Sequence, residues 1–281
     1  MIPSEMQRPS LTPLIVLAAA SLSGCMSSPM INASALDYKT SKDVIFTPAS
    51  WPAPLVADIY QPASEKPTPA VLLIHGGGWN GKERRSDMTA IAKSLAKRGY
   101  FVMNATYRLT PGWKFPAQTE DINEALAYLR RNATDLNLDP DRIGTFGYSA
   151  GAHLASLAGL DPKNHIKVIV SGGTPADLRF WPDGRLTGLL LGGPLKGNEA
   201  IYREASPVTH VTPKSPPVFL YHGTADTLVP IEHAHAYIAS LEKNQVTHEV
   251  YWIEGRSHVM AHLFPAQAIS KAIDFLDQHL K

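Results

Sequence analysis

The chain has 281 residues, and its 26 basic and 25 acidic side chains leave a formal net charge of +1. A chain of this length suits one large α/β domain or two small ones. A charge so nearly balanced argues against a nucleic-acid-binding protein and against a strongly acidic partner.

The first feature along the chain is an apolar run at residues 11–22, LTPLIVLAAASL. The run has the length of a secretory signal and is too short for a membrane-spanning helix, which needs about 20 apolar residues. The sequence LSGC that ends at Cys25 follows, and it resembles the lipobox of bacterial lipoproteins. Cys25 is the only cysteine, so it cannot form an intrachain disulfide or a multi-cysteine metal site. The alternative is an ordinary secretory leader with a chance cluster of small residues.

The lipobox resemblance implies a lipoprotein signal peptide at residues 1–24 and a mature chain that begins at an acylated Cys25, with palmitate as a typical acyl chain. Residues 25–40 then form a tether. The implied location is the bacterial cell envelope, with the lipid as membrane anchor. Met26 after the cysteine favours the outer membrane, with the domain facing the periplasm or the surface. The sequence leaves the oligomeric state open.

Residues 41–281 alternate strand and helix signals. Segments 43–46 and 55–60 predict an antiparallel opening pair, and the continuous apolar run at 70–75 predicts a strand buried on both faces. Further strands are expected at 100–107, 142–149, 167–173, 217–223 and 248–253, with helices at 87–98 and 119–131, between 149 and 167, and after each of the last two strands. The pattern predicts an α/β fold with a mostly parallel sheet and helices on both faces. Residues 174–216 fit no period, and we interpret them as a cap or pocket insertion.

The stretch VLLIHGGGWNGKERR, residues 71–85, allows two interpretations. Gly76, Gly81 and Lys82 have the spacing of a phosphate-binding loop. That motif needs Ser or Thr after the lysine, and Glu83 stands there with a carboxylate that would repel phosphate. Alternatively, the HGGG turn at 75–78 can expose backbone N–H groups to an oxyanion and so serve a nucleophile elsewhere in the chain.

GYSAG, residues 147–151, matches the G-x-S-x-G pattern between a predicted strand and a predicted helix, which is the context of a nucleophile elbow. A serine hydroxyl is a poor nucleophile unless a base takes its proton. In folds that carry a nucleophile elbow, the catalytic residues follow one another along the chain as Ser, acid and His. Ser149, Asp226 and His258 have this order. The acid and the histidine both follow strands, so we expect them at the carboxyl edge of the sheet.

Each candidate has rivals. Asp177 and Asp183 are alternatives to Asp226, which could also serve only as a helix cap. His262 and His279 are alternatives to His258. The remaining candidates share a structural interpretation, as packed or loop-holding histidines: His75, His153 and His222.

The motifs HGGGW, YRLTPGWKFPAQTEDINEAL, DPDRIGTFGYSAGAHLA and HGTADTLVP resemble those of the α/β-hydrolase superfamily. Within it the chain is similar to the small esterases related to hormone-sensitive lipase, to acetyl-xylan and feruloyl (BD-FAE-like) esterases, and to kynurenine formamidase. The Gly-x-x-His context of His258 resembles the histidine loop of these enzymes. The resemblance implies an α/β-hydrolase fold over residues 41–281.

Carried over to this chain, the resemblance implies that the backbone N–H groups of Gly77, Gly78 and Ala150 bind the oxyanion. Glycine is required in the turn because side chains would block the substrate from the backbone. We interpret Trp79 as pocket wall or as packing, and Trp113 and Trp181 as further candidates for an aromatic pocket wall.

The predicted function is that of a serine carboxylesterase. It would hydrolyse short-chain acyl esters, acetyl or feruloyl and carbohydrate-linked among them, through an acyl-enzyme and without a metal or cofactor. Its partner would be a small-molecule ester. A serine peptidase, an arylformamidase and a non-enzymatic binding protein of the same fold are the alternatives.

Overall fold

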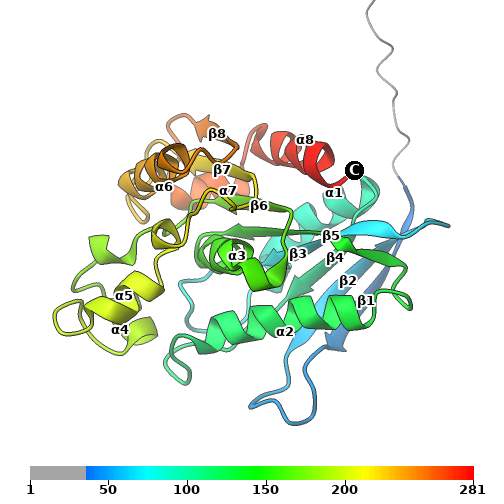
Figure 1. Ribbon diagram of the computed structural model, residues 1–281, viewed down its shortest axis with the longest axis horizontal. Coiled ribbons are helices and arrows are strands. Elements are labelled where there is room, and N and C mark those ends of the chain that lie inside the picture. Colours follow the sequence, from blue (N-terminus) through cyan, green and yellow to red (C-terminus); the bar gives the residue numbers. More distant parts are fainter. Residues whose placement is uncertain (1–35) are drawn as a thin grey trace, which may run out of the picture. The chain divides into compact units, whose positions relative to one another are not determined.

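The structure, a computed structural model, describes residues 36–281 (Figure 1). Cys25, the expected leader and most of the expected tether lie outside the described residues. Eight strands form one sheet in the order β1-β2-β4-β3-β5-β6-β7-β8. No helix of this described part is both long and apolar enough to cross a membrane.

The strands are β1 (Tyr38–Ile45), β2 (Val56–Pro62), β3 (Thr68–Ile74), β4 (Phe101–Ala105), β5 (Leu138–Tyr148), β6 (Val168–Gly172), β7 (Val218–Gly223) and β8 (His248–Ile253). The α-helices are α1 (Thr89–Lys97), α2 (Ala117–Arg131), α3 (Ala150–Leu160), α4 (Arg185–Leu191), α5 (Glu199–Glu204), α6 (Glu232–Lys243), α7 (His258–Leu263) and α8 (Ala268–Leu280). Four short 3-10 helices are η1 (Arg85–Met88), η2 (Pro162–Asn164), η3 (Leu178–Phe180) and η4 (Pro207–Thr209).

The sheet opens with antiparallel pairs and continues parallel, as the sequence predicts. β1 pairs with β2 and β2 with β4 in antiparallel fashion, and every later pair is parallel. The first strand begins earlier than expected, because Tyr38 already pairs with Pro62. The domain therefore starts inside the segment 25–40 that we expected to be a tether.

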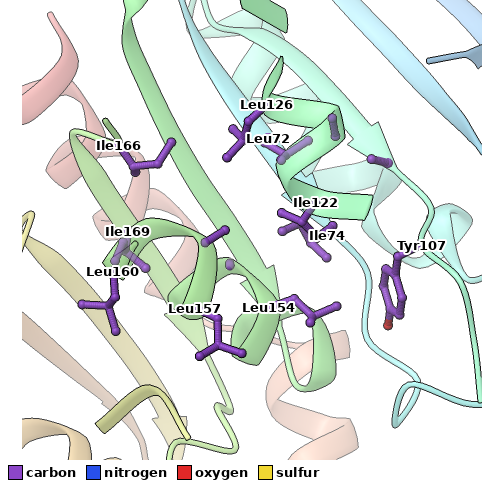
Figure 2. Packing of buried hydrophobic residues seen from close by; sticks show 14 of the residues in the cluster. Leu72, Ile74, Tyr107, Ile122, Leu126, Leu154, Leu157, Leu160, Ile166 and Ile169 are labelled. Atoms are coloured by element: carbon purple, nitrogen blue, oxygen red, sulfur yellow. The ribbon is translucent and has the colours of Figure 1, made fainter. Parts of the chain in front are cut away.

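The central strand β3 is buried on both faces, and its alternating side chains supply two separate cores. Leu72 and Ile74 belong to one apolar cluster with residues of α2 and α3, whereas Val71 and Leu73 belong to another with residues of α1 and α8. Figure 2 shows Leu72 beside Leu126 and Ile74 beside Ile122, both residues of α2. Helices on both faces thus make β3 and its parallel neighbours a fixed platform for the loops that follow them.

The sequence of segment 174–216 fits no period and suggested an irregular structure. The segment nevertheless contains the helices α4, α5, η3 and η4. We call residues 174–216 the cap. Its two α-helices have seven and six residues, which is too short for a helical apolar stripe to repeat in the sequence. Tyr202 of α5 is fully buried and packs in the same core cluster as α2 and α3, so the cap is fastened to the domain.

The long motif at residues 107–126 has a structural role that its sequence did not reveal. Arg108 is buried, and its Nε donates to Asp121 Oδ1 over 2.8 Å. Trp51 Nε1 donates to the same oxygen over 2.8 Å. The Trp113 ring lies 4.9 Å from the Arg108 guanidinium carbon. This buried charge pair with its aromatic cover joins the start of α2 to the segment after β4.

Candidate active site

Four segments that carry candidate site residues begin where parallel strands end. The HGGG turn follows β3, Ser149 follows β5, Asp226 lies just beyond β7, and His258 lies beyond β8. Because parallel strands share one carboxyl edge, the fold gathers these segments at the same edge of the sheet, as expected from the sequence.

Ser149 occupies the turn between β5 and α3 with φ 56° and ψ −125°. A non-glycine residue at positive φ is strained, and such strain concentrates at functional sites. The turn closes only because its flanking glycines lack side chains. A Cβ on Gly147 would lie 2.2 Å from the Gly151 carbonyl oxygen, and a Cβ on Gly151 would lie 2.1 Å from the Ile74 oxygen.

His258 and Asp226 form a short hydrogen bond, with His258 Nδ1 at 2.6 Å from Asp226 Oδ2. The second carboxylate oxygen accepts the backbone N–H groups of Leu228 and Val229 over 3.0 and 2.8 Å. His222 Nε2 donates to the Val229 carbonyl over 2.8 Å and so closes the same loop. With Nδ1 donating to the carboxylate, His258 Nε2 is left as an acceptor, which is the state a general base needs.

Tyr148, which the sequence did not single out, supports His258 from the β5 side. Its hydroxyl donates to the His258 carbonyl over 2.6 Å, and its ring centroid lies 5.1 Å from that of the imidazole. Gly173 leaves room for the His258 imidazole, since a Cβ at position 173 would lie 3.1 Å from His258 Cε1. Tyr148, the first x of the G-x-S-x-G motif, thus links the serine turn to α7, which begins at His258.

The glycine turn lies directly against the serine turn. A Cβ on Gly76 would be 3.3 Å from Ser149 Cβ. Gly77 and Gly78 have φ values of 112° and 62°, which side-chain-bearing residues rarely adopt. Added Cβ atoms on these two glycines would also meet Arg84 Cδ and Leu186 Cδ1 at 2.9 Å each. The turn therefore needs glycine for its conformation and for space.

One cavity of about 690 Å³ joins these parts, and its lining is mainly apolar. Ser149, His258 and all three oxyanion candidates line it, while Asp226 lies behind His258. Of the three tryptophans considered as pocket wall, Trp79 and Trp181 line the cavity. Trp113 does not, because it covers Arg108 instead. The cap contributes Leu186 and Arg185, which the sequence gave no reason to select.

The rival residues have other surroundings. Asp177 pairs with Arg179 over 2.7 Å and caps η3. His279 packs its ring against Phe275. His262 does line the cavity, and it stacks on Tyr148 with ring centroids 4.6 Å apart. Burial lowers the pKa of His262, and among residues 36–281 only His258 has an imidazole hydrogen-bonded to a carboxylate.

The residues given a structural interpretation are all tied to backbone groups. The His75 ring nitrogen Nδ1 lies 2.7 Å from the Gly76 oxygen, and the ring stacks on Tyr107. Glu83, at the position where a phosphate-binding loop needs Ser or Thr, pairs with Arg85 over 2.9 Å. Within the described range, no three His, Cys, Asp or Glu side chains are grouped as metal ligands.

The chain is similar to a known family and to named proteins. The model of the BD-FAE family matches residues 57–241. "Esterase LipC" of Mycobacterium tuberculosis is 28% identical over 196 residues, covering 63% of this chain and 49% of its own length. The "Probable carboxylic ester hydrolase LipM" of the same species is 29% identical over 194 residues, with coverages of 62% and 45%. The chain thus spans about half the length of these curated relatives.

Among solved structures, a truncated carbohydrate esterase from gut microbiota superposes with a TM-score of 0.77 at 22% identity, over 88% of this chain and 97% of that one. A bifunctional GH43-CE protein of Bacteroides eggerthii gives 0.76 at 26% identity, over 85% and 38%. The first similarity shows the α/β-hydrolase fold.

Proposed function

The chain belongs to the BD-FAE family, and on that premise we propose that it is a serine carboxylesterase acting on short-chain acyl esters. The observation that carries the proposal is the joint arrangement of a strained Ser149, a hydrogen-bonded Asp226–His258 pair and a glycine turn around one cavity. The naming of its relatives as esterases and a carboxylic ester hydrolase supports the same reaction class.

The proposed reaction is acyl transfer in two steps. His258 Nε2 takes the proton of Ser149 Oγ as the oxygen attacks the ester carbonyl, and the protonated imidazole then gives that proton to the leaving alcohol. Asp226 holds the imidazole in the required tautomer and stabilises its charged form. Water next attacks the acyl-enzyme by the same route and releases the acid and the free serine.

We assign the oxyanion to the backbone N–H groups of Gly77, Gly78 and Ala150. Ala150 is the first residue of α3, so its N–H is one of the helix-terminal donors without an intrahelical partner. The loss of one oxyanion donor typically costs about 100- to 1,000-fold in turnover. Gly77, Gly78 and Ala150 line the same cavity as Ser149.

For the natural substrate we propose an acetyl or feruloyl ester of a carbohydrate. The mainly apolar lining, with Trp79 and Trp181 in the wall, suits an acyl group or an aromatic acid. The carbohydrate part of the proposal is supported by the name of the gut-microbiota structure with the same fold.

Acyl-chain preference provides the first test. We expect higher kcat/KM for p-nitrophenyl acetate and butyrate than for the laurate ester, because cap helices of seven and six residues are too short to form a large lipase lid. The same panel should include an aminoacyl-anilide and N-formylkynurenine. Preference for either of these would favour a peptidase or an arylformamidase, an optimum at C12 would contradict the short-chain assignment, and no turnover of any compound would favour a binding protein.

We further propose that Cys25 is acylated and anchors the protein to a bacterial envelope membrane, most simply the outer membrane. The support is the LSGC sequence after a signal-length apolar run. One acyl chain gives only marginal membrane binding, whereas several together hold stably. Replacing Cys25 by Ala should abolish the acyl mass and release the protein from the membrane fraction. A wild-type protein that fractionates as soluble, with no acyl mass on Cys25, would contradict the anchor.

A further inference from the structure

His153 lies in the first turn of α3, and its backbone N–H donates to the Ser149 carbonyl over 3.0 Å. Its side chain is fully buried and bridges two segments that are distant in sequence. Trp79 Nε1 donates to His153 Nδ1 over 3.2 Å, and His153 Nε2 lies 2.7 Å from the Ala205 carbonyl oxygen in the cap. Since an indole N–H only donates and a carbonyl only accepts, the imidazole must carry its proton on Nε2.

The imidazole keeps this neutral form at physiological pH. Burial, with smaller contributions from His210 and His233, lowers the pKa of His153 to about 4. The Trp79 indole stands edge-on to the imidazole, with centroids 5.0 Å apart and planes at 80°. Nδ1 is therefore a fixed acceptor aimed at one donor.

Trp79 is the residue through which this acceptor can act on the glycine turn. It follows Gly78 directly and has a φ of 58°, so residues 77–79 form a run of three left-handed positions. Such a run is strained at Trp79 and persists only where surrounding contacts hold it. The Trp79 backbone carbonyl accepts from Thr110 N over 2.8 Å. Among residues 36–281 the bond to His153 is the only hydrogen bond of its side chain.

We propose that His153 is a positioning residue for the oxyanion turn. By accepting the Trp79 indole N–H it fixes the peptide units of Gly77 and Gly78, so that their N–H groups face the position of the developing oxyanion. The bond from His153 to Ala205 anchors the imidazole to the cap. This role rests on the proposed esterase function.

The proposal has a kinetic consequence that general destabilisation lacks. The oxyanion develops only as the serine attacks, so a misplaced turn weakens binding of the transition state more than binding of the ester. The loss should therefore fall on kcat with little change in KM. Since complete loss of a donor costs about 100- to 1,000-fold, displacement of the turn should cost about 10- to 100-fold.

Two substitutions at His153 separate its two hydrogen bonds. In His153→Asn the amide oxygen can occupy the place of Nδ1 and still accept from Trp79, while the bond to Ala205 is lost. In His153→Gln the amide reaches the place of Nε2 and can still donate to Ala205, while the acceptor for Trp79 is lost. Trp79→Phe removes the same N–H from the other side and keeps an aromatic ring in the wall.

For p-nitrophenyl acetate we expect His153→Gln and Trp79→Phe each to lose about 10- to 100-fold in kcat at nearly unchanged KM, and His153→Asn to retain most of its kcat. Affinity for a trifluoromethyl ketone, which forms a tetrahedral adduct with the serine, should fall in step with kcat. Tm measured in parallel should be similar for the two His153 variants, since each loses one buried hydrogen bond.

Equal kcat losses in His153→Asn and His153→Gln, losses that follow Tm, or an unchanged kcat in Trp79→Phe would each overturn the role of His153. If the wild-type protein hydrolyses the ester no faster than Ser149→Ala does, the proposed function would be overturned, and the role of His153 with it. The wild-type and Ser149→Ala assays therefore distinguish the two failures.

Discussion

Replacing Asp226 by Asn is expected to lower kcat for ester hydrolysis by about 10,000-fold, because the amide would hold His258 in the wrong tautomer. In the native protein the His258 Nδ1 proton points at Asp226 Oδ2 over 2.6 Å. An amide N–H at that position would require Nδ1 to accept, which places the proton on Nε2. A protonated Nε2 cannot take the proton of Ser149. The other oxygen can still accept the Leu228 and Val229 N–H groups, so the loop should stay folded.

Asp177→Asn is the matched control for this prediction. Asp177 is also buried and also pairs with a basic side chain, Arg179, but it lies in the cap and does not contact His258. We expect its kcat to remain within about threefold of the wild type, since breaking a partly exposed ion pair costs little. A kcat for Asp226→Asn within tenfold of the wild type, with circular dichroism unchanged, would remove Asp226 from the proposed triad.

Replacing Gly151 by Ala is expected to destabilise the fold by about 4 kcal/mol or more, a loss of about 10 °C or more in Tm. The added Cβ would lie 2.1 Å from the Ile74 oxygen and 2.6 Å from the His75 oxygen. Both are backbone atoms at the end of the central strand, so neither can move without disturbing β3.

Gly188→Ala provides the control, because Gly188 lies inside α4 and its added Cβ would meet no atom closer than 3.7 Å. Alanine is favoured over glycine in a helix by about 1 kcal/mol, so this variant should match or exceed the wild-type Tm. Thermal unfolding followed by circular dichroism measures both. A Gly151→Ala protein with the wild-type Tm would contradict the close packing of the elbow against β3.

The sheet and the positions of the site could be predicted because short-range patterns fix them. The apolar run of β3, the G-x-S-x-G turn and the strand before Asp226 each carry their signal within a few residues. The chain order of Ser149, Asp226 and His258 then places them at one edge, since parallel strands share it. What the sequence could not show was pairing at long range, such as Tyr38 with Pro62, which moved the start of β1.

The supports of the site were hidden for the same reason. Tyr148 reaches His258 across 110 positions in the chain, and Trp79 reaches His153 across 74. Neither hydrogen bond can be predicted from the periodicity or the composition of the sequence. Trp113 was a reasonable candidate for the pocket wall by residue type, but its partner Arg108 is visible only once the chain is folded. Aromatic residue type alone therefore does not distinguish pocket wall from packing.

Covalent labelling of Ser149 tests the central claim most directly. The protein would be treated with a fluorophosphonate, and the adduct would be followed by intact mass and located by peptide mapping while ester hydrolysis is assayed in parallel. We expect one adduct, on Ser149, with activity lost in proportion to labelling, and neither labelling nor hydrolysis in a folded Ser149→Ala variant. An adduct on another residue, or a Ser149→Ala protein that still hydrolyses p-nitrophenyl acetate, would contradict the assignment of Ser149 as the nucleophile.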